Sequence, residues 1–302
     1  MKIGNYEFKK SVSEIDYSVP SDIDQKYIEA QKSGKRLVLG TLVARSGTRW
    51  VCDIFSAHPN ATGVTERYAL PESFYRYITY HQLPIDTSGI ISLLKKGIVE
   101  DWQKADISLV FSPYFSHGIE ELVNQLRPEE VIIGLAEPRF TVQSIYNKGV
   151  FEEELFYTNT EKVIGYQPNV PGQWSHFLGR IIPSGSEYEV WKDLTRIGKI
   201  TWWGNRIMSD IHKQLVRVPR EKIYIFNLPD ADQKYAYYLT MAKHFNLFPL
   251  LTEKAFLSLK EKTVRSSDNV SHEWSEQEVS EFDVHSKEWL EIYAKLCAKK
   301  LL

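Results

Sequence analysis

The chain has 302 residues, and its 37 lysines and arginines nearly balance 39 aspartates and glutamates, giving a formal net charge of −2. Hydrophobic residues make up 43% of the sequence and charged residues 25%, a profile that excludes global disorder. The charge balance argues against a strongly basic nucleic-acid binder and against a polyacidic tail. We expect one domain over residues 1–302, because single α/β domains often reach such lengths.

The expected compartment follows from cysteine usage and from the N-terminus. Cys52 and Cys297 lie far apart with no CxxC spacing, so neither a disulfide framework nor a zinc site is predicted. Residues 1–20 lack the apolar core of a secretory signal, and no window approaches the roughly 18 apolar residues of a membrane span. We expect a cytoplasmic protein with no metal, no nucleic acid and no membrane partner.

A polar lead-in, residues 1–35, precedes the first predicted strand, Arg36–Val43, which is short, apolar and β-branched. A turn of small and polar residues follows, and then a helix over Arg49–His58 with apolar residues at helical spacing. The next strand, Ile107–Phe111, is followed by a helix over His117–Leu126.

The pattern of strand and helix then repeats. A strand over Val131–Ala136 leads into a helix over Arg139–Lys148, and a strand over Ile223–Phe226 leads into a helix over Asp230–Phe245. Strands that alternate with helices predict βαβ units. We therefore expect a three-layer α/β fold with a mostly parallel central sheet and helices on both faces. Three stretches are less regular: 66–98 and 151–182 show no clean periodicity, and 191–216 is read as helical.

The loop between the first strand and its helix is the most informative segment. Backbone N–H groups and the positive end of the helix dipole converge there, which favours an anion such as phosphate. The loop is not a Walker A sequence, because the lysine before the hydroxyl residue is missing. Arg45 is the available cation, and Gly47 permits a tight turn. A plain strand–turn–helix is the alternative interpretation of these residues alone.

The string from Ala44 to Asn60, A-R-S-G-T-R-W-V-C-D-I-F-S-A-H-P-N, resembles the opening motif of sulfotransferases that use 3′-phosphoadenosine 5′-phosphosulfate (PAPS). Residues 131–148 resemble the family's second motif, a strand and helix that hold the 3′-phosphate of the cofactor. Residues 112–114 and 217–247 resemble its middle and late segments. The resemblance implies a P-loop-like sulfotransferase domain, with residues 255–302 forming a C-terminal loop and helix that close over the cofactor.

The first motif implies a set of cofactor-binding residues. Arg45 matches the basic residue that faces the 5′-phosphosulfate, where a cation offsets the charge that builds as the sulfuryl group leaves. The remaining members are Ser46, Gly47 and Thr48 as donors, Arg49 where the family usually has threonine, and Trp50 near the adenine. A core position is the alternative for Trp50.

The second motif departs from the family at one position. Ser144 matches its serine, but Ala136 stands where an arginine is usual. Arg139 could partly replace that arginine, because a guanidinium binds phosphate bidentately. Arg265 matches the late basic loop over the same phosphate. A surface ion pair for Arg139 and an exposed loop position for Arg265 are the alternatives.

Transfer to a hydroxyl or amine requires a base within about 2.6–3.2 Å of the proton. Glu66 is the first candidate for this base, and His117 is the second. The alternative for Glu66 is a surface ion pair with Arg67, and the alternative for His117 is a position at the start of a helix. His58 is expected to be structural. Aromatic residues of the irregular segments are expected to line the pocket of a small-molecule acceptor, such as a secondary metabolite. These aromatics are Tyr68, Tyr75, Tyr77, Tyr80, Trp174 and Trp202.

Two other functions are compatible with parts of this pattern. A P-loop kinase or nucleotide hydrolase shares the phosphate-binding geometry but requires the missing lysine. A catalytically impaired relative that acts as a binding protein is compatible with Ala136. The main prediction is a sulfotransferase that yields 3′-phosphoadenosine 5′-phosphate as its second product.

Overall fold

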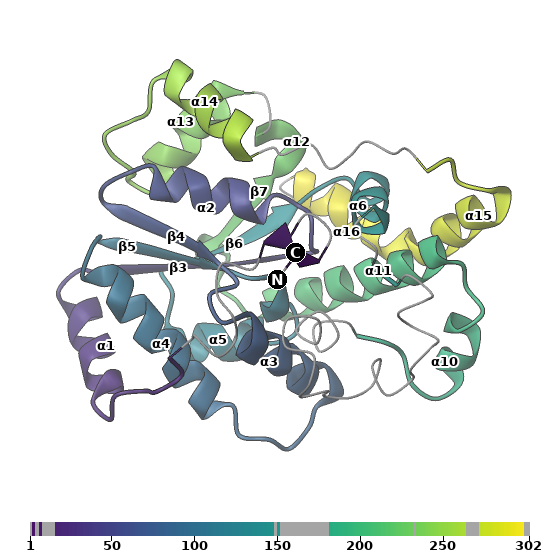
Figure 1. The fold of residues 1–302 in the computed structure, drawn as a ribbon, viewed down its shortest axis with the longest axis horizontal. Helices are drawn as coiled ribbons and strands as arrows, with labels where there is room; N and C mark the ends of the chain where they lie inside the picture. The colour runs from purple at the N-terminus through teal and green to yellow at the C-terminus, as the bar shows by residue number, and fades with distance from the viewer. Residues whose placement is uncertain are drawn as a thin grey trace.

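Parallel strands form the centre of the computed structural model (Figure 1). The structure describes residues 2–3, 6–7, 16–147, 150–151, 181–231, 234–263 and 272–298. In these ranges the central sheet has five strands, β3 Arg36–Leu42, β4 Ala61–Thr65, β5 Ile107–Phe111, β6 Glu130–Leu135 and β7 Ile223–Asn227. Their order is β4-β5-β3-β6-β7, and every neighbouring pair is parallel. A separate antiparallel pair joins β1 Lys2–Ile3 to β2 Tyr6–Glu7.

Helices surround this sheet. In the first half of the chain they are α1 Ile23–Lys32, α2 Thr48–Ser56, α3 Ala69–His81, α4 Ser88–Trp102, the 3₁₀ turn η2 Pro113–Phe115, α5 Ile119–Leu126 and α6 Pro138–Tyr146. In the second half they are α10 Ser186–Trp191, α11 Arg196–Leu215, η3 Arg220–Lys222, α12 Leu228–Ala231, α13 Tyr235–His244, α14 Glu253–Thr263, α15 Glu276–His285 and α16 Lys287–Cys297.

The helices form two layers, one on each face of the sheet (Figure 1). Side chains alternate along a strand, so Val38 and Leu42 of β3 face α2, α13 and α14, whereas Leu37 and Leu39 face α1, α3, α4 and α5. On that second face β6 packs against α6, α11, α15 and α16. The expected three-layer α/β fold, with a parallel sheet and helices on both faces, is therefore confirmed.

The topology brings several predicted segments to one edge of the sheet. Central strand β3 pairs with β5 on one side and with β6 on the other. In open α/β sheets ligands bind beyond the carboxyl ends of strands, where the strand order reverses. The segments that follow β3, β4, β5, β6 and β7 all begin at this edge.

The four predicted strands are confirmed, but segment 66–98 is more regular than its sequence pattern predicts. It contains α3 and most of α4, and it follows the strand β4, which the pattern did not predict. Strand β4 is a short edge strand, A-T-G-V-T, with few apolar residues. Pro71 lies in the first turn of α3, where proline is tolerated. The polar lead-in also contains α1, which buries only Ile23 and Tyr27.

Three helices begin later than their patterns predict. One is α13, which starts at Tyr235 where the pattern predicted a helix from Asp230. Within 191–216, α10 ends at Trp191 and α11 starts at Arg196, because the Thr195 side chain caps α11 by accepting a hydrogen bond from the Gly198 amide. The helix expected from His117 begins at Ile119, so His117 lies in the connection before it. This position sets the surroundings of the His117 ring.

Candidate functional site

The loop between β3 and α2, residues 43–47, is a tight turn at the carboxyl edge of the sheet. Arg45 has φ 73° and Gly47 has φ 96°, so two of its residues take left-handed backbone conformations. A Cβ on Gly47 would lie 2.9 Å from Leu228 Cδ1, and glycine thus suits the position sterically as well. Ser46 is buried, whereas Arg45 is exposed. The first N–H groups of α2 receive no side-chain cap.

Arg45 joins this loop to α6. Its Nε donates a hydrogen bond to Ser144 Oγ at 3.2 Å, and Ser144 is 8% exposed. The two residues are 99 positions apart in sequence. The structure thus brings together one predicted cofactor residue from each of the two motifs.

Trp50 occupies a core position on α2. It is 4% exposed, and its ring packs against Phe256 of α14 with the centroids 5.2 Å apart. Arg49, one residue earlier, is exposed. The structure therefore places Trp50 where the core interpretation expected it.

The start of α6 carries a negative side chain at the position where the family resemblance predicts the 3′-phosphate of the cofactor. Glu137 caps the helix, and its carboxylate accepts hydrogen bonds from the amides of Arg139 and Phe140. Ala136 is buried and uncharged. Arg139 is exposed, and its guanidinium lies 4.5 Å from the ring centre of Trp274. Arg139 therefore packs on an aromatic ring, while Arg265 lies outside the described residues.

Glu66 follows β4 and has φ 48°, with its amide donating to the Phe111 carbonyl at 3.2 Å. Its neighbour Arg67 forms an ion pair with the buried Asp101. Burial raises the pKa of Glu66, and positive charge nearby opposes this rise. The arginines that contribute it are Arg76, Arg49 and Arg45. Glu66 therefore does not form the surface ion pair with Arg67 that was its alternative interpretation, and three other arginines act on its carboxylate instead.

Arg76 of α3 is a buried cation that lies between these groups. It is 1% exposed, and its guanidinium carbon lies 5.0 Å from the ring centre of Tyr114 and 5.8 Å from that of Trp203. Burial lowers its pKa to about 10, so it keeps its charge at neutral pH. It acts electrostatically on both Glu66 and His117.

His117 pairs with an acid on a distant helix. Its Nδ1 lies 2.9 Å from Asp210 Oδ2 of α11, and its side chain is 2% exposed. Nε2 is buried and has no hydrogen-bond partner among the described residues. Burial lowers the pKa of His117, Arg76 and Arg206 lower it further, and Asp210 opposes them. The ring is therefore neutral at pH 7, with one nitrogen able to accept a proton.

The predicted aromatic residues do not act as one group. Tyr75 and Tyr68 belong to the core under α4, and Trp202 belongs to the core around α11. Tyr80 meets His117 edge-on with ring centres 5.2 Å apart, and Tyr77 packs on His81 at 4.5 Å. Trp174 lies outside the described residues. Among the predicted pocket residues that the structure describes, Tyr80 is thus one that contacts a candidate catalytic residue, His117.

No family model matches the chain, and no curated protein matches its sequence. The chemistry of these residues is therefore what indicates a function for this chain.

The sequence pattern did not indicate three charged residues near the site, which are the buried Glu72 and Arg76 and the partly buried Asp210. Glu72 is 0% exposed and accepts a hydrogen bond from the Tyr68 amide, and burial raises its pKa to about 7. Glu72 and Arg76 lie in the segment without clean periodicity, so no helical face was assigned to them. Asp210 is 93 positions from His117, and no local spacing links two residues so far apart.

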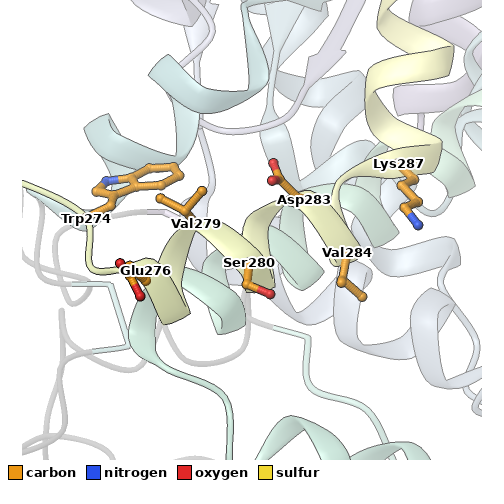
Figure 2. A pocket seen from close by; sticks show the side chains of 7 residues that line it. All are labelled: Trp274, Glu276, Val279, Ser280, Asp283, Val284 and Lys287. Carbon is orange, nitrogen blue, oxygen red and sulfur yellow. The ribbon is translucent and has the colours of Figure 1, made fainter.

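An open hollow of about 460 Å³ lies elsewhere, along α15 (Figure 2). Its lining residues are Trp274, Glu276, Val279, Ser280, Asp283, Val284 and Lys287. None of them is a predicted site residue, although Trp274 contacts Arg139. In the described part of the chain, no cluster of histidines, cysteines and acids could hold a metal ion, and no helix is long and apolar enough to cross a membrane.

Proposed function

We propose that the protein is a sulfotransferase that moves the sulfuryl group of PAPS to a hydroxyl or amine of a small-molecule acceptor. The observation that carries this proposal is the hydrogen bond from Arg45 to Ser144, which joins the loop after β3 to α6. Buried acid–base groups follow the neighbouring strands at the same edge of the sheet. A turn with uncapped amides and an arginine, at the same edge of the sheet as a neutral histidine, suits transfer of an anionic group to a protic acceptor.

The donor set fits the 5′ end of PAPS better than the 3′ end. Arg45, Ser46 and Thr48 would hold the 5′-phosphosulfate, with the backbone amides at the start of α2. At the 3′ end Ser144 is present, but Glu137 already occupies amides of α6. Ala136 supplies no charge there. PAPS would supply the sulfuryl group and a phosphate leaving group.

The side chains of this chain would then perform two tasks. Arg45 offsets the negative charge that develops on the leaving phosphate, an electrostatic effect that is strongest when the donor is held in place beforehand. His117 or Glu66 takes the acceptor's proton. We favour His117, because its buried ring is neutral and its Nε2 has no hydrogen-bond partner among the described residues, so that nitrogen can accept a proton.

The deciding experiment is a thermal-shift titration with 3′-phosphoadenosine 5′-phosphate, with ATP and NAD as controls. A ligand that binds only the native state stabilises it by about 2.7 kcal/mol at one hundred times its Kd. We expect a rise in Tm that is specific to the 3′-phosphate nucleotide. An equal or larger rise with ATP would contradict the proposal and favour a nucleotide-dependent kinase or hydrolase.

The second candidate is a catalytically impaired relative that acts as a binding protein, and the carboxylate of Glu137 at the start of α6 favours it. The two functions differ in the response to Glu66→Gln and His117→Asn. In the enzyme, each variant retains nucleotide binding, and loss of the base lowers the rate of sulfuryl transfer by a factor of 10²–10⁴. A binding protein shows weak nucleotide affinity and no transfer in the wild type. A cytoplasmic location and a role in secondary metabolism belong to the enzyme proposal.

A further inference from the structure

Asp210 is the only acid of α11, and it reaches the buried ring of His117. Two basic residues of the same helix form ion pairs with its carboxylate. Arg206 Nε lies 3.3 Å from Oδ2 and Lys213 Nζ lies 3.8 Å from Oδ1. The Asp210 side chain is 18% exposed. A carboxylate fixed in this way presents one acceptor oxygen to Nδ1 of His117.

The two nitrogens of the His117 ring differ in their surroundings. Nδ1 faces Asp210, whereas Nε2 is buried and has no partner among the described residues. Arg76 and Tyr80 from α3 and Arg206 from α11 are the other charged or titratable groups that act on the ring or contact it. Both arginines disfavour a second proton. The neutral ring therefore donates from Nδ1 and keeps its lone pair on Nε2.

His58 shows how a structural histidine is satisfied in the same protein. Its Nδ1 lies 2.8 Å from the Ile54 carbonyl and its Nε2 lies 3.0 Å from the hydroxyl of Tyr238. Both ring nitrogens thus have partners. The His117 side chain is likewise buried, at 2% exposed, but it has a partner at Nδ1 alone in the described structure, and this difference indicates a chemical role for Nε2.

We propose that Asp210 is the positioning residue that fixes His117 as the Nδ1–H tautomer and leaves Nε2 to accept the proton of the sulfuryl acceptor. The role in transfer rests on the proposed function. Nε2 takes the proton that the acceptor oxygen or nitrogen loses as it bonds to sulfur. The electron pair of the broken sulfur–oxygen bond leaves on the phosphate. Asp210 then stabilises the imidazolium through the bond at Nδ1.

The test is a two-bond ¹H–¹⁵N spectrum of the full chain labelled at histidine, recorded across a pH series, with His117→Asn to assign the signal. We expect the wild-type ring to be the Nδ1–H tautomer, with a pKa below the ordinary histidine value. In Asp210→Asn the pKa falls further, because the bond that favours the imidazolium is lost, and the single tautomer is replaced by a mixture or by Nε2–H.

Gln214→Ala is the matched control. Gln214 lies one turn beyond Asp210 and joins α11 to the same segment, since its Nε2 donates to the Ser116 carbonyl at 2.8 Å. Removing this bond loosens the packing of the segment while the Asp210 contact remains. We expect an unchanged tautomer and pKa in this variant, so a shift confined to Asp210→Asn supports positioning.

Two results would overturn the proposal. One is a wild-type ring protonated at Nε2; the other is a His117 signal that responds equally to Asp210→Asn and Gln214→Ala. Binding of 3′-phosphoadenosine 5′-phosphate is measured on the same samples. If the wild-type protein does not bind this nucleotide, the proposed function is contradicted. The tautomer of His117 tests the pairing with Asp210 independently of that result.

Discussion

At the scale of single residues, the site combines exposed cations with buried charges. Arg45 and Arg49 are exposed, while Arg76 and Glu72 are buried on α3. Burial disfavours the charged form of both side chains, and it therefore lowers the pKa of Arg76 and raises the pKa of Glu72. The buried carboxyl of Glu72 is therefore best tested by a substitution that removes the charge and conserves the shape of the side chain.

We expect Arg45→Ala to weaken the affinity for 3′-phosphoadenosine 5′-phosphate by about ten- to a hundredfold, because a hydrogen bond to a charged group contributes roughly 1.5–3 kcal/mol. Calorimetric titration measures this effect. Arg217→Ala removes an arginine that pairs with Glu120 on the surface and serves as the control. Equal affinities of the two variants would contradict a role for Arg45 in anion binding.

We expect Glu72→Gln to stabilise the protein more at pH 8 than at pH 5. The folded-state pKa of Glu72 is about 7, above its usual 4.5, so the folded state loses stability as pH rises through this interval. Such a rise in pKa is equivalent to on the order of 3 kcal/mol, which the glutamine avoids. Urea denaturation at both pH values measures the difference.

Ser73→Ala is the control for this prediction, because Ser73 is the next residue of α3, is fully buried and does not titrate. Its effect on the free energy of unfolding should be the same at both pH values. If Glu72→Gln also shows no dependence on pH, then Glu72 is ionised in the folded protein at pH 5.

At the scale of elements, most of the sheet could be predicted from sequence. Buried parallel strands such as Ile107–Phe111 are nearly continuous apolar runs, and that signal does not depend on tertiary contacts. The edge strand β4 has few apolar residues and so carries little of this signal, and its position depends on contact with α2. The loop of Arg45 could be predicted from its local motif. The pairs Arg45–Ser144 and His117–Asp210 could not, because chain folding alone brings their partners together.

The contact between β4 and α2 predicts that Gly63→Ala destabilises the protein. A Cβ at Gly63 would lie 2.2 Å from the Cys52 carbonyl oxygen, a backbone atom that can give way only if α2 moves. Overpacking of this kind typically costs 1–3 kcal/mol or more. Thermal and urea denaturation measure the loss.

Gly89→Ala is the matched control. Gly89 lies in the first turn of α4, and a Cβ there meets no atom within 4 Å. Alanine in a helix is favoured over glycine, so the free energy of unfolding should stay unchanged or rise by up to about 1 kcal/mol. Destabilisation of similar size in both variants would mean that the β4–α2 contact is not what limits position 63.

At the scale of the whole molecule, helices from the middle and from the C-terminal part of the chain complete one layer. Helices α15 and α16 pack against α11, which also contacts α5 and α6 on the same face of the sheet (Figure 1). Helix α11 therefore connects the C-terminal helices to the segment that carries His117. We therefore expect a substitution that disrupts the packing of α16 to destabilise this whole layer.

Trp289 of α16 is the side chain on which we expect this layer to depend most. It is 1% exposed, and a Cβ at Gly204 of α11 would lie 2.3 Å from its ring. Trp289→Ala is expected to lower the free energy of unfolding by about 3–5 kcal/mol, as burial of a large ring is lost and a cavity remains. The neighbouring Leu290 is 38% exposed, and Leu290→Ala should change stability by no more than about 0.5 kcal/mol. Urea denaturation of both variants decides the point, since losses of equal size would mean that α16 is not anchored to α11 through Trp289.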